Sequence, residues 1–282
     1  STVLAGLYAA IRTSGETIGA QRMLIAGAGA SAQGIADLFV CALRDEGLPI
    51  EDARRRIATV DSRGLVTADR PGLEPFKATY AQPAAEVADY VCGDPRRVTL
   101  EEAVRNFRPT ILVGTSGTPG AFTEGVVRSM AAIHARPIVF PLSNPTSKSE
   151  CTAEQAVRWS DGRAIVATGS PFPPVAFGGR LHRIGQGNNA FIFPGVGLGV
   201  LASGARSVTD EMFLAAATAL SQWAPIRRES FAALYPSMDV VRDISYDVAL
   251  AVGIEAVRQG VAESASPEVL RDRILQCMWT PV

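Results

Sequence analysis

A glycine-rich segment near the start of the chain has the residue types and spacing of a phosphate-binding turn. Gly27, Gly29 and Ala32 fit the pattern G-x-G-x-x-(G/A) between a predicted strand and a predicted helix. The glycines would permit a tight turn and a close approach to a pyrophosphate, which the free N–H groups of the helix would bind. The alternative is a glycine-rich turn without a ligand. The candidate cofactor contacts here are Gly27, Ala28, Gly29, Ser31 and Ala32.

An acidic residue follows the next predicted strand. Asp61 comes after the apolar run 57–60, where a carboxylate can accept both hydroxyls of an adenosine ribose. Ser62 and Arg63 follow, and the Arg63 guanidinium could instead bind the 2′-phosphate of NADP, because its forked donors fit a phosphate. A surface turn without a cofactor role is an equally good interpretation of Arg63.

Polar residues also follow the third and fourth predicted strands. Thr115, Ser116 and Gly117 form one group, and Asn144 lies in the other. Ligands of open α/β sheets bind at this edge, and an amide both donates and accepts, so Asn144 could hold a nicotinamide ribose or a substrate oxygen. An Asn-Pro turn is the open alternative.

Two adjacent amides, Asn188 and Asn189, precede a glycine-rich helical segment and suit neutral hydrogen bonding of a carboxylate. Gly195 and Gly199 in that segment are one helical turn apart, so the helix could approach neighbouring backbone closely.

The elements that must position these residues alternate along the chain. Apolar runs predict strands at 22–26, 57–60, 110–113, 137–142 and 164–167. Helical spacing predicts helices at 31–44, 99–107, 122–133 and 152–159, after a leading helix marked by Val3, Leu4, Leu7 and Ile11. This alternation predicts an α/β fold with a doubly wound, Rossmann-type parallel sheet.

The rest of the chain has a different pattern. Residues 68–83 are rich in Pro, Gly and Asp and predict a loop. Additional C-terminal helices are predicted at 210–223, 240–258 and 267–278. We therefore expect a Rossmann core with its leading helix over 1–206. A helical extension over 207–282 would pack on the sheet, with a separate small domain as the alternative.

The composition of the chain limits the kinds of partner that it is expected to bind. The chain has 27 Lys and Arg against 28 Asp and Glu, so no basic face for nucleic acid is expected. The uncharged stretch 184–205 contains amides, a proline and many glycines, so no membrane partner is expected. The 4 cysteines lie far apart, which predicts reduced thiols in a cytoplasmic chain. The 2 histidines lack metal-ligand spacing and are expected on the surface, and no metal site is predicted.

Taken together, these segments resemble the C-terminal, NAD(P)-binding half of the malic enzyme family, and more closely the bacterial large-type malic and malolactic enzymes. Ser-Asn-Pro-Thr at 143–146 and Gly-Gln-Gly-Asn-Asn at 185–189 are the most specific parts. The matching segments are Gly27–Gly34, Val60–Gly64, Gly114–Glu124, Pro141–Ala153, Ala167–Pro174, Gly185–Gly199 and Thr209–Phe213.

The resemblance implies a parent enzyme that oxidises malate by hydride transfer to NAD(P) and releases pyruvate and CO2. Mn²⁺ or Mg²⁺ would act as the Lewis acid, and a Lys/Tyr pair would move the protons. The family carries these groups in an N-terminal half that is absent here. We therefore expect no catalytic residue in this chain, no turnover by the chain alone, and the N-terminal half as a partner in a homo-oligomeric parent.

Carried onto this sequence, the resemblance makes Asn144 and Asn189 contacts of malate or pyruvate and of the nicotinamide end. Asn188 would support the site, and Asp61 would take the adenosine ribose. The charge of Asp61 favours NAD, with NADP left open. Two alternatives also remain open: a malolactic enzyme, which converts malate to lactate, and a non-catalytic dinucleotide-binding module.

Overall fold

The computed structural model describes residues 1–279, and its centre is one sheet of seven strands. The strands are β1 (Met23–Ala26), β2 (Ile57–Asp61), β3 (Gly64–Leu65), β4 (Ile111–Gly114), β5 (Ile138–Pro141), β6 (Ile165–Thr168) and β9 (Gly185–Gln186). Their spatial order is β3-β2-β1-β4-β5-β6-β9, and all pairs are parallel except β2 with β3. The predicted α/β fold with a doubly wound sheet is therefore confirmed.

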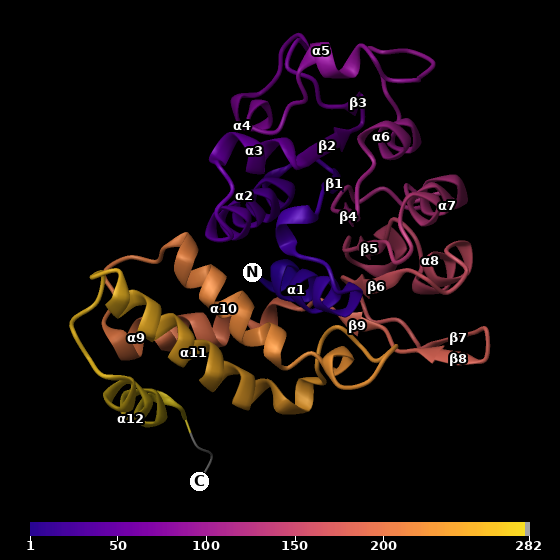
Figure 1. Cartoon of the computed structure of the whole chain (residues 1–282). Helices are drawn as coiled ribbons and strands as arrows, with labels where there is room; N and C mark the ends of the chain where they lie inside the picture. Colours follow the sequence, from indigo (N-terminus) through magenta and orange to yellow (C-terminus); the bar gives the residue numbers. More distant parts are fainter. Residues whose placement is uncertain (280–282) are drawn as a thin grey trace.

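Helices cover both faces of this sheet (Figure 1). The principal ones are α1 (Thr2–Ser14), α2 (Ala30–Asp45), α3 (Ile50–Arg55), α6 (Leu100–Phe107), α7 (Glu124–Ile133), α8 (Ala153–Trp159), α9 (Phe193–Ser203), α10 (Asp210–Gln222), α11 (Val241–Arg258) and α12 (Pro267–Cys277). Side chains of a strand alternate between faces. In β1, Met23 and Ile25 therefore join the core under α1 and α2, whereas Leu24 and Ala26 join the core under α6, α7 and α8.

The C-terminal helices share a core with the first of these layers. α10 packs against α1 and α2, and α11 packs against α9 and α10. Met212 of α10 and Val248 of α11 belong to the same buried cluster as Leu7 of α1 and Ile25 of β1. These helices thus reach the sheet through α1 and α2. The division between residues 206 and 207 remains a prediction.

The shortest helices and strands of the structure were not predicted from the sequence. The segment predicted as a loop contains α4 (Pro75–Ala78) and is followed by α5 (Ala84–Val87). A hairpin of β7 (Val175–Phe177) and β8 (Arg180–His182) also went unpredicted, as did β3 and β9. The two helices make a single turn each and the unpredicted strands have two or three residues, so neither a helical period nor an apolar run of four residues could develop in them.

No helix in the described part of the chain combines the length and apolar composition that a bilayer crossing needs.

The glycines of α9 allow the close helix packing that their spacing predicted. A Cβ added at Gly195 would lie 2.6 Å from Val248 Cβ, and one at Gly199 would lie 2.6 Å from the carbonyl oxygen of Ala249. A Cβ added at Gly197, on the exposed side of the same helix, would have no neighbouring atom within 4 Å. The interpretation that Gly195 and Gly199 serve close backbone approach is confirmed.

We expect Gly199→Ala to lower the free energy of unfolding by about 1–3 kcal/mol, because the new methyl group would push α9 away from α11. The matched control Gly197→Ala should raise it by up to about 1 kcal/mol, since alanine is the better helix former in open space. Urea unfolding of both variants tests this. Equal shifts in the same direction would contradict the packing argument.

Candidate functional site

Two adjoining cavities open at the carboxyl ends of the central strands. The first, of about 640 Å³, lies between the Gly27 turn and Asp61, and we call it the Asp61 cavity. The second, of about 890 Å³, includes Asn144 in its wall, and we call it the Asn144 cavity. Thr115 and Ser116 line both. The shared wall lies where the strand order reverses between β1 and β4, the position at which open α/β sheets bind ligands.

The glycine turn joins β1 to α2 at the centre of this cleft. Gly27 has a φ of +128°, and a side chain there would lie 2.9 Å from the carbonyl carbon of Thr115. Gly29 is the N-cap of α2, with no side chain capping the helix and no atom within 4 Å of where its Cβ would be. Gly27 therefore serves the turn, and Gly29 leaves open space in front of uncapped helix N–H groups, which favour an anion.

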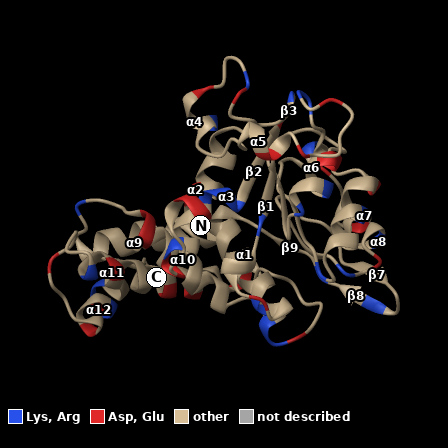
Figure 2. Ribbon diagram, turned by 45° about the horizontal axis from the view of Figure 1, so that its top comes forward, with Lys and Arg blue, Asp and Glu red and all other residues tan. Residues whose placement is uncertain are grey.

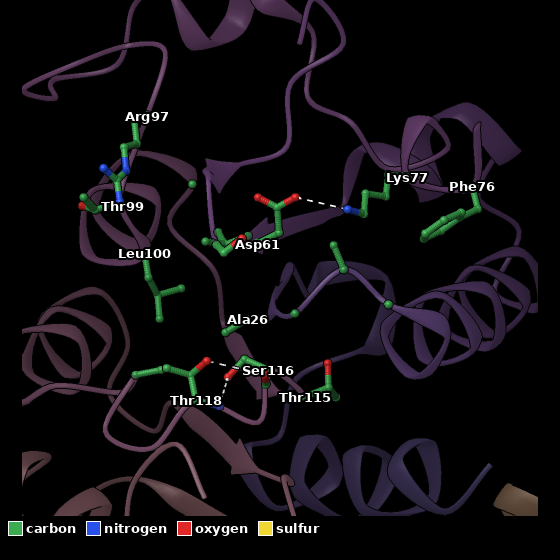
Figure 3. Close-up of a pocket in the computed structure, with 17 residues that line it drawn as sticks. Ala26, Asp61, Phe76, Lys77, Arg97, Thr99, Leu100, Thr115, Ser116 and Thr118 are labelled. Atoms are coloured by element: carbon green, nitrogen blue, oxygen red, sulfur yellow. Dashed lines mark hydrogen bonds and ion pairs between the residues drawn. The ribbon is translucent and has the colours of Figure 1, made fainter. Parts of the chain in front are cut away.

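Asp61 is held by basic residues at the other end of the Asp61 cavity, and Figure 3 shows the contact with one of them, Lys77. Arg70 Nη1 donates to both carboxylate oxygens at 2.8 Å, and Lys77 Nζ lies 3.4 Å from Oδ2. The backbone N–H of Arg63 donates to Oδ1 at 2.9 Å. Partial burial alone would raise the pKa of Asp61, but the hydrogen bonds from Arg63, Arg70 and Lys77 outweigh it and hold the pKa below its ordinary value.

These two basic side chains come from one folded segment, residues 67–82, which we call the strap. Its ends meet in a bridge between Thr67 and Gln82. Tyr80, also in the strap, donates from its hydroxyl to Asp37 of α2 at 2.6 Å. Arg70 also donates to the carbonyl oxygens of Gly64 and Leu65. Basic residues consequently lie near α4 and β3 at this end of the cleft (Figure 2).

Replacing Asp61 should change stability in a pH-dependent way. Because its folded pKa is lowered, the carboxylate stabilises the fold above its ordinary pKa near 3.8, and this contribution is lost as the pH falls through the folded value. We expect Asp61→Asn to cost about 1–3 kcal/mol at pH 7 and progressively less below about pH 4.

Unfolding of the Asp61→Asn variant at a series of pH values measures this effect. Glu154→Gln is a suitable control, since Glu154 pairs with Arg158 on the exposed face of α8 and should contribute little. A stability difference between Asp61→Asn and the native chain that does not vary with pH would contradict the assignment.

The loops after β4 and β5 are joined under the cleft. Ser116 donates to Glu150 from its N–H and its hydroxyl, each at 2.9 Å. The N–H of Gly117 donates to Ser143 Oγ at 2.9 Å, and Ser143 Oγ donates to Glu150 at 2.5 Å. Ser116, Gly117 and Ser143 therefore meet the Asn144 cavity as one connected wall.

The three candidate amides have different surroundings. Asn144 Oδ1 accepts from Ser170 Oγ at 2.5 Å, and Asn189 Oδ1 accepts from Thr2 Oγ1 at 3.1 Å. Both amides line the Asn144 cavity, and neither NH2 group has a hydrogen-bond partner among residues 1–279, so each can donate into the cavity. Asn188 Oδ1 instead accepts from the N–H of Ala190, capping the short 3-10 helix Asn189–Phe191.

The structure thus brings most of the sequence-predicted residues to one cleft. The lining residues among them are Gly27, Ala28, Gly29, Ser31, Asp61, Ser62, Thr115, Ser116, Gly117, Asn144 and Asn189. Three others lie outside both cavities. Ala32 is buried in the core, the Arg63 side chain is exposed, and Asn188 is the cap just described.

Sequence reasoning missed four residues that hold the cleft together: Arg70, Lys77, Glu150 and Ser170. Glu150 and Ser170 lie inside two of the matching segments, which was the available signal for them. Arg70 and Lys77 lie in the segment predicted as a loop, where no pattern marked them.

The expected surface position was wrong for one histidine. His182 is buried, packs edge-on against Phe231 with ring centroids 5.2 Å apart, and lies away from the cleft. Burial lowers its pKa, and nearby Arg180 and Arg136 lower it further.

Metal ligation needs several acidic, thiol or imidazole side chains in one place. Within residues 1–279, no group of three or more His, Cys, Asp and Glu side chains could hold a metal ion. The donor set for Mn²⁺ or Mg²⁺ implied by the resemblance is therefore not formed by the described residues.

A parallel sheet with a glycine turn after β1, an uncapped α2 and an acidic residue at the end of β2 defines a dinucleotide-binding α/β domain. The family model described as "Malic enzyme, NAD binding domain" matches residues 1–257, and the chain belongs to that family.

Two relatives named as NAD-dependent malic enzymes are longer than this chain. The NAD-dependent malic enzyme of Sodalis glossinidius (strain morsitans) is 44% identical over 281 residues, which are 100% of this chain and 50% of that protein. The NAD-dependent malic enzyme of Shewanella sp. (strain ANA-3) is 41% identical, with the same shares covered. This chain therefore spans about half the length of the curated relatives it matches.

Solved structures show the same likeness. The malic enzyme of Entamoeba histolytica superposes with a TM-score of 0.75 at 25% identity, covering 98% of this chain and 51% of that one. The malic enzyme of Pyrococcus horikoshii Ot3 gives a TM-score of 0.70 at 26% identity, covering 98% and 57%.

Proposed function

We propose that the cleft binds NAD along the carboxyl edge of the sheet. The pyrophosphate would lie at the N-terminus of α2, the adenosine ribose at Asp61 and the nicotinamide in the Asn144 cavity. The observation that carries this proposal is the open space beside Gly29, in front of a helix end that no side chain caps. When bound, NAD supplies the hydride acceptor.

The ribose end of the site requires an exchange of hydrogen bonds. A carboxylate offers about four acceptor positions, and those of Asp61 already face Arg70, Lys77 and the N–H of Arg63. The contact with Lys77, at 3.4 Å, is the longest of these. A ribose hydroxyl that donates to Asp61 would therefore replace Lys77 and leave the shorter contacts in place.

The charge of Asp61 favours NAD over NADP, because a 2′-phosphate would bring a second negative group against the carboxylate. Lys77 and Arg97 also line the cavity and reduce that repulsion. We therefore propose NAD as the preferred cofactor, with NADP binding more weakly.

Calorimetric titration of the chain with NAD⁺ and then NADP⁺ should give tighter binding of NAD⁺. Asp61→Ala should weaken the binding of NAD⁺ by about 10- to 100-fold, as expected for a lost hydrogen bond to a charged group. It should also reduce the difference in affinity between NAD⁺ and NADP⁺. Glu154→Ala, a change of equal charge on the far surface of α8, should alter neither affinity. Unchanged NAD⁺ affinity in a folded Asp61→Ala variant would contradict the ribose assignment.

We further propose that the parent protein is a malic enzyme that converts malate to pyruvate and CO2 with hydride transfer to NAD. In that reaction Asn144 and Asn189 would orient the substrate by hydrogen bonds from their free NH2 groups. The proton-transfer groups and the metal ligands would come from an N-terminal half, in a cytoplasmic homo-oligomer.

The residues that line the Asn144 cavity support the proposal that the proton-transfer groups come from another part of the parent protein. Among the described residues, Asp37 and Asp210 are its only lining residues with ionisable side chains. Asp37 already accepts hydrogen bonds from Tyr80 and Gln33. No lysine or tyrosine of residues 1–279 lines this cavity to move a proton to or from a substrate.

The chain alone should therefore produce no NADH from malate, NAD⁺ and Mn²⁺, even where calorimetry shows that it binds NAD⁺. Absorbance at the NADH band measures this. A malate-dependent rise would overturn the proposal that the other half supplies the proton-transfer groups.

A further inference from the structure

Glu150 has the most unusual environment of any carboxylate near the cleft. Its side chain is fully buried, and within residues 1–279 it forms no ion pair. Four donors compensate for the lost hydration. Oε1 accepts from the N–H and hydroxyl of Ser116 and from the hydroxyl of Ser143, and Oε2 accepts from the N–H of Ser143 at 3.3 Å. Burying a carboxylate costs several kcal/mol unless such donors satisfy it.

The carboxylate also fixes the direction of every hydrogen bond around it. A carboxylate only accepts, so both serine hydroxyls must donate to it and present their lone pairs elsewhere. The lone pairs of Ser143 Oγ meet the N–H of Gly117 at 2.9 Å, and those of Ser116 Oγ meet the N–H of Thr118 at 3.1 Å. One buried group thereby orders the backbone of two loops that follow different strands.

Glu150 itself does not reach the cleft. It lines neither cavity, and its carboxyl group lies against the end of β4, where a Cβ added to Gly114 would be 2.5 Å from Glu150 Cδ. The residues it holds, Ser116 and Ser143, do line the Asn144 cavity. Its influence on a ligand must therefore pass through them.

We infer that Glu150 is a positioning residue, which sets the geometry of residues 115–118 and 143–144 toward the nicotinamide end of the cofactor. This inference rests on the proposed binding of NAD in the cleft. A glutamine at this position keeps the shape but turns one acceptor into an NH2 group. In either orientation that group would face a backbone N–H, of Ser143 at the Oε2 position or of Ser116 at the Oε1 position. Two donors cannot bond, so one of the two loops would shift.

A double-mutant cycle on NAD⁺ affinity tests the inference. Glu150→Gln and Ser143→Ala should each weaken NAD⁺ binding about tenfold, measured by calorimetry well below the unfolding midpoint of every variant. The double variant should bind about as weakly as either single variant, because both changes break the same network. Unchanged affinity in the folded single variants, or fully additive losses, would overturn the inference.

Ser160→Ala supplies the matched control for a purely structural effect. Ser160 is a fully buried serine that bonds the carbonyls of Ala156 and Val157 and the N–H of Ala164, and it lies outside both cavities. Its replacement should lower the unfolding midpoint and leave the NAD⁺ affinity unchanged. An equal loss of affinity in Ser160→Ala would mean that general destabilisation explains the Glu150 variants.

Amide hydrogen exchange in the chain without cofactor provides a readout that does not depend on NAD. Glu150→Gln should speed exchange at Gly117 and Thr118 about tenfold, and Ser160→Ala should not. If the native chain fails to bind NAD⁺, the proposed function fails, and the exchange rates still decide the role of Glu150. Unchanged exchange at both amides in Glu150→Gln would overturn that role.

Discussion

The cleft depends on one repeated backbone interaction: the loop after a strand begins with an N–H that donates to the last residues of the neighbouring parallel strand. The bonds are Gly27 to Val60 at 2.7 Å, Thr115 to Ala26 at 2.8 Å, Leu142 to Gly114 at 3.0 Å and Gly169 to Pro141 at 3.1 Å. The parallel register thus continues one residue beyond the strands and fixes the loops relative to one another. The contacts of Ser116 with Glu150, of Gly117 with Ser143 and of Ser170 with Asn144 are built on that alignment.

This constraint explains why part of the site could be predicted from sequence. Gly27, Asp61, Thr115 and Asn144 each come shortly after a short apolar run. Parallel strands end at a common edge of the sheet. Residues that directly follow such strands therefore lie close together at that edge, whatever the arrangement of the helices. The fold class was predictable for the same reason, since alternating strands and helices allow few other arrangements.

The partners of these residues could not be predicted, because they arise only when distant segments fold together. Arg70 and Lys77 follow Asp61 by 9 and 16 positions, within a strap whose Pro, Gly and Asp content indicated a loop. Arg63 is nearer in sequence, and the sequence suggested only a 2′-phosphate or a surface turn as the setting of its side chain. In the structure its backbone N–H contacts Asp61, while its side chain is exposed.

Two carboxylates of the site illustrate opposite solutions to the cost of burial. Asp61 is compensated by cations and faces a cavity, and its contact with Lys77 at 3.4 Å is long enough for a ligand hydroxyl to replace. Glu150 is compensated by neutral donors and lines neither the Asp61 cavity nor the Asn144 cavity, so a ligand in them cannot replace one of its partners. A group that must bond a ligand has to keep a replaceable partner, whereas a group that must hold two loops has to keep all of its partners. Asp61 has a replaceable partner beside a cavity and Glu150 has none, so their environments suit them to different tasks.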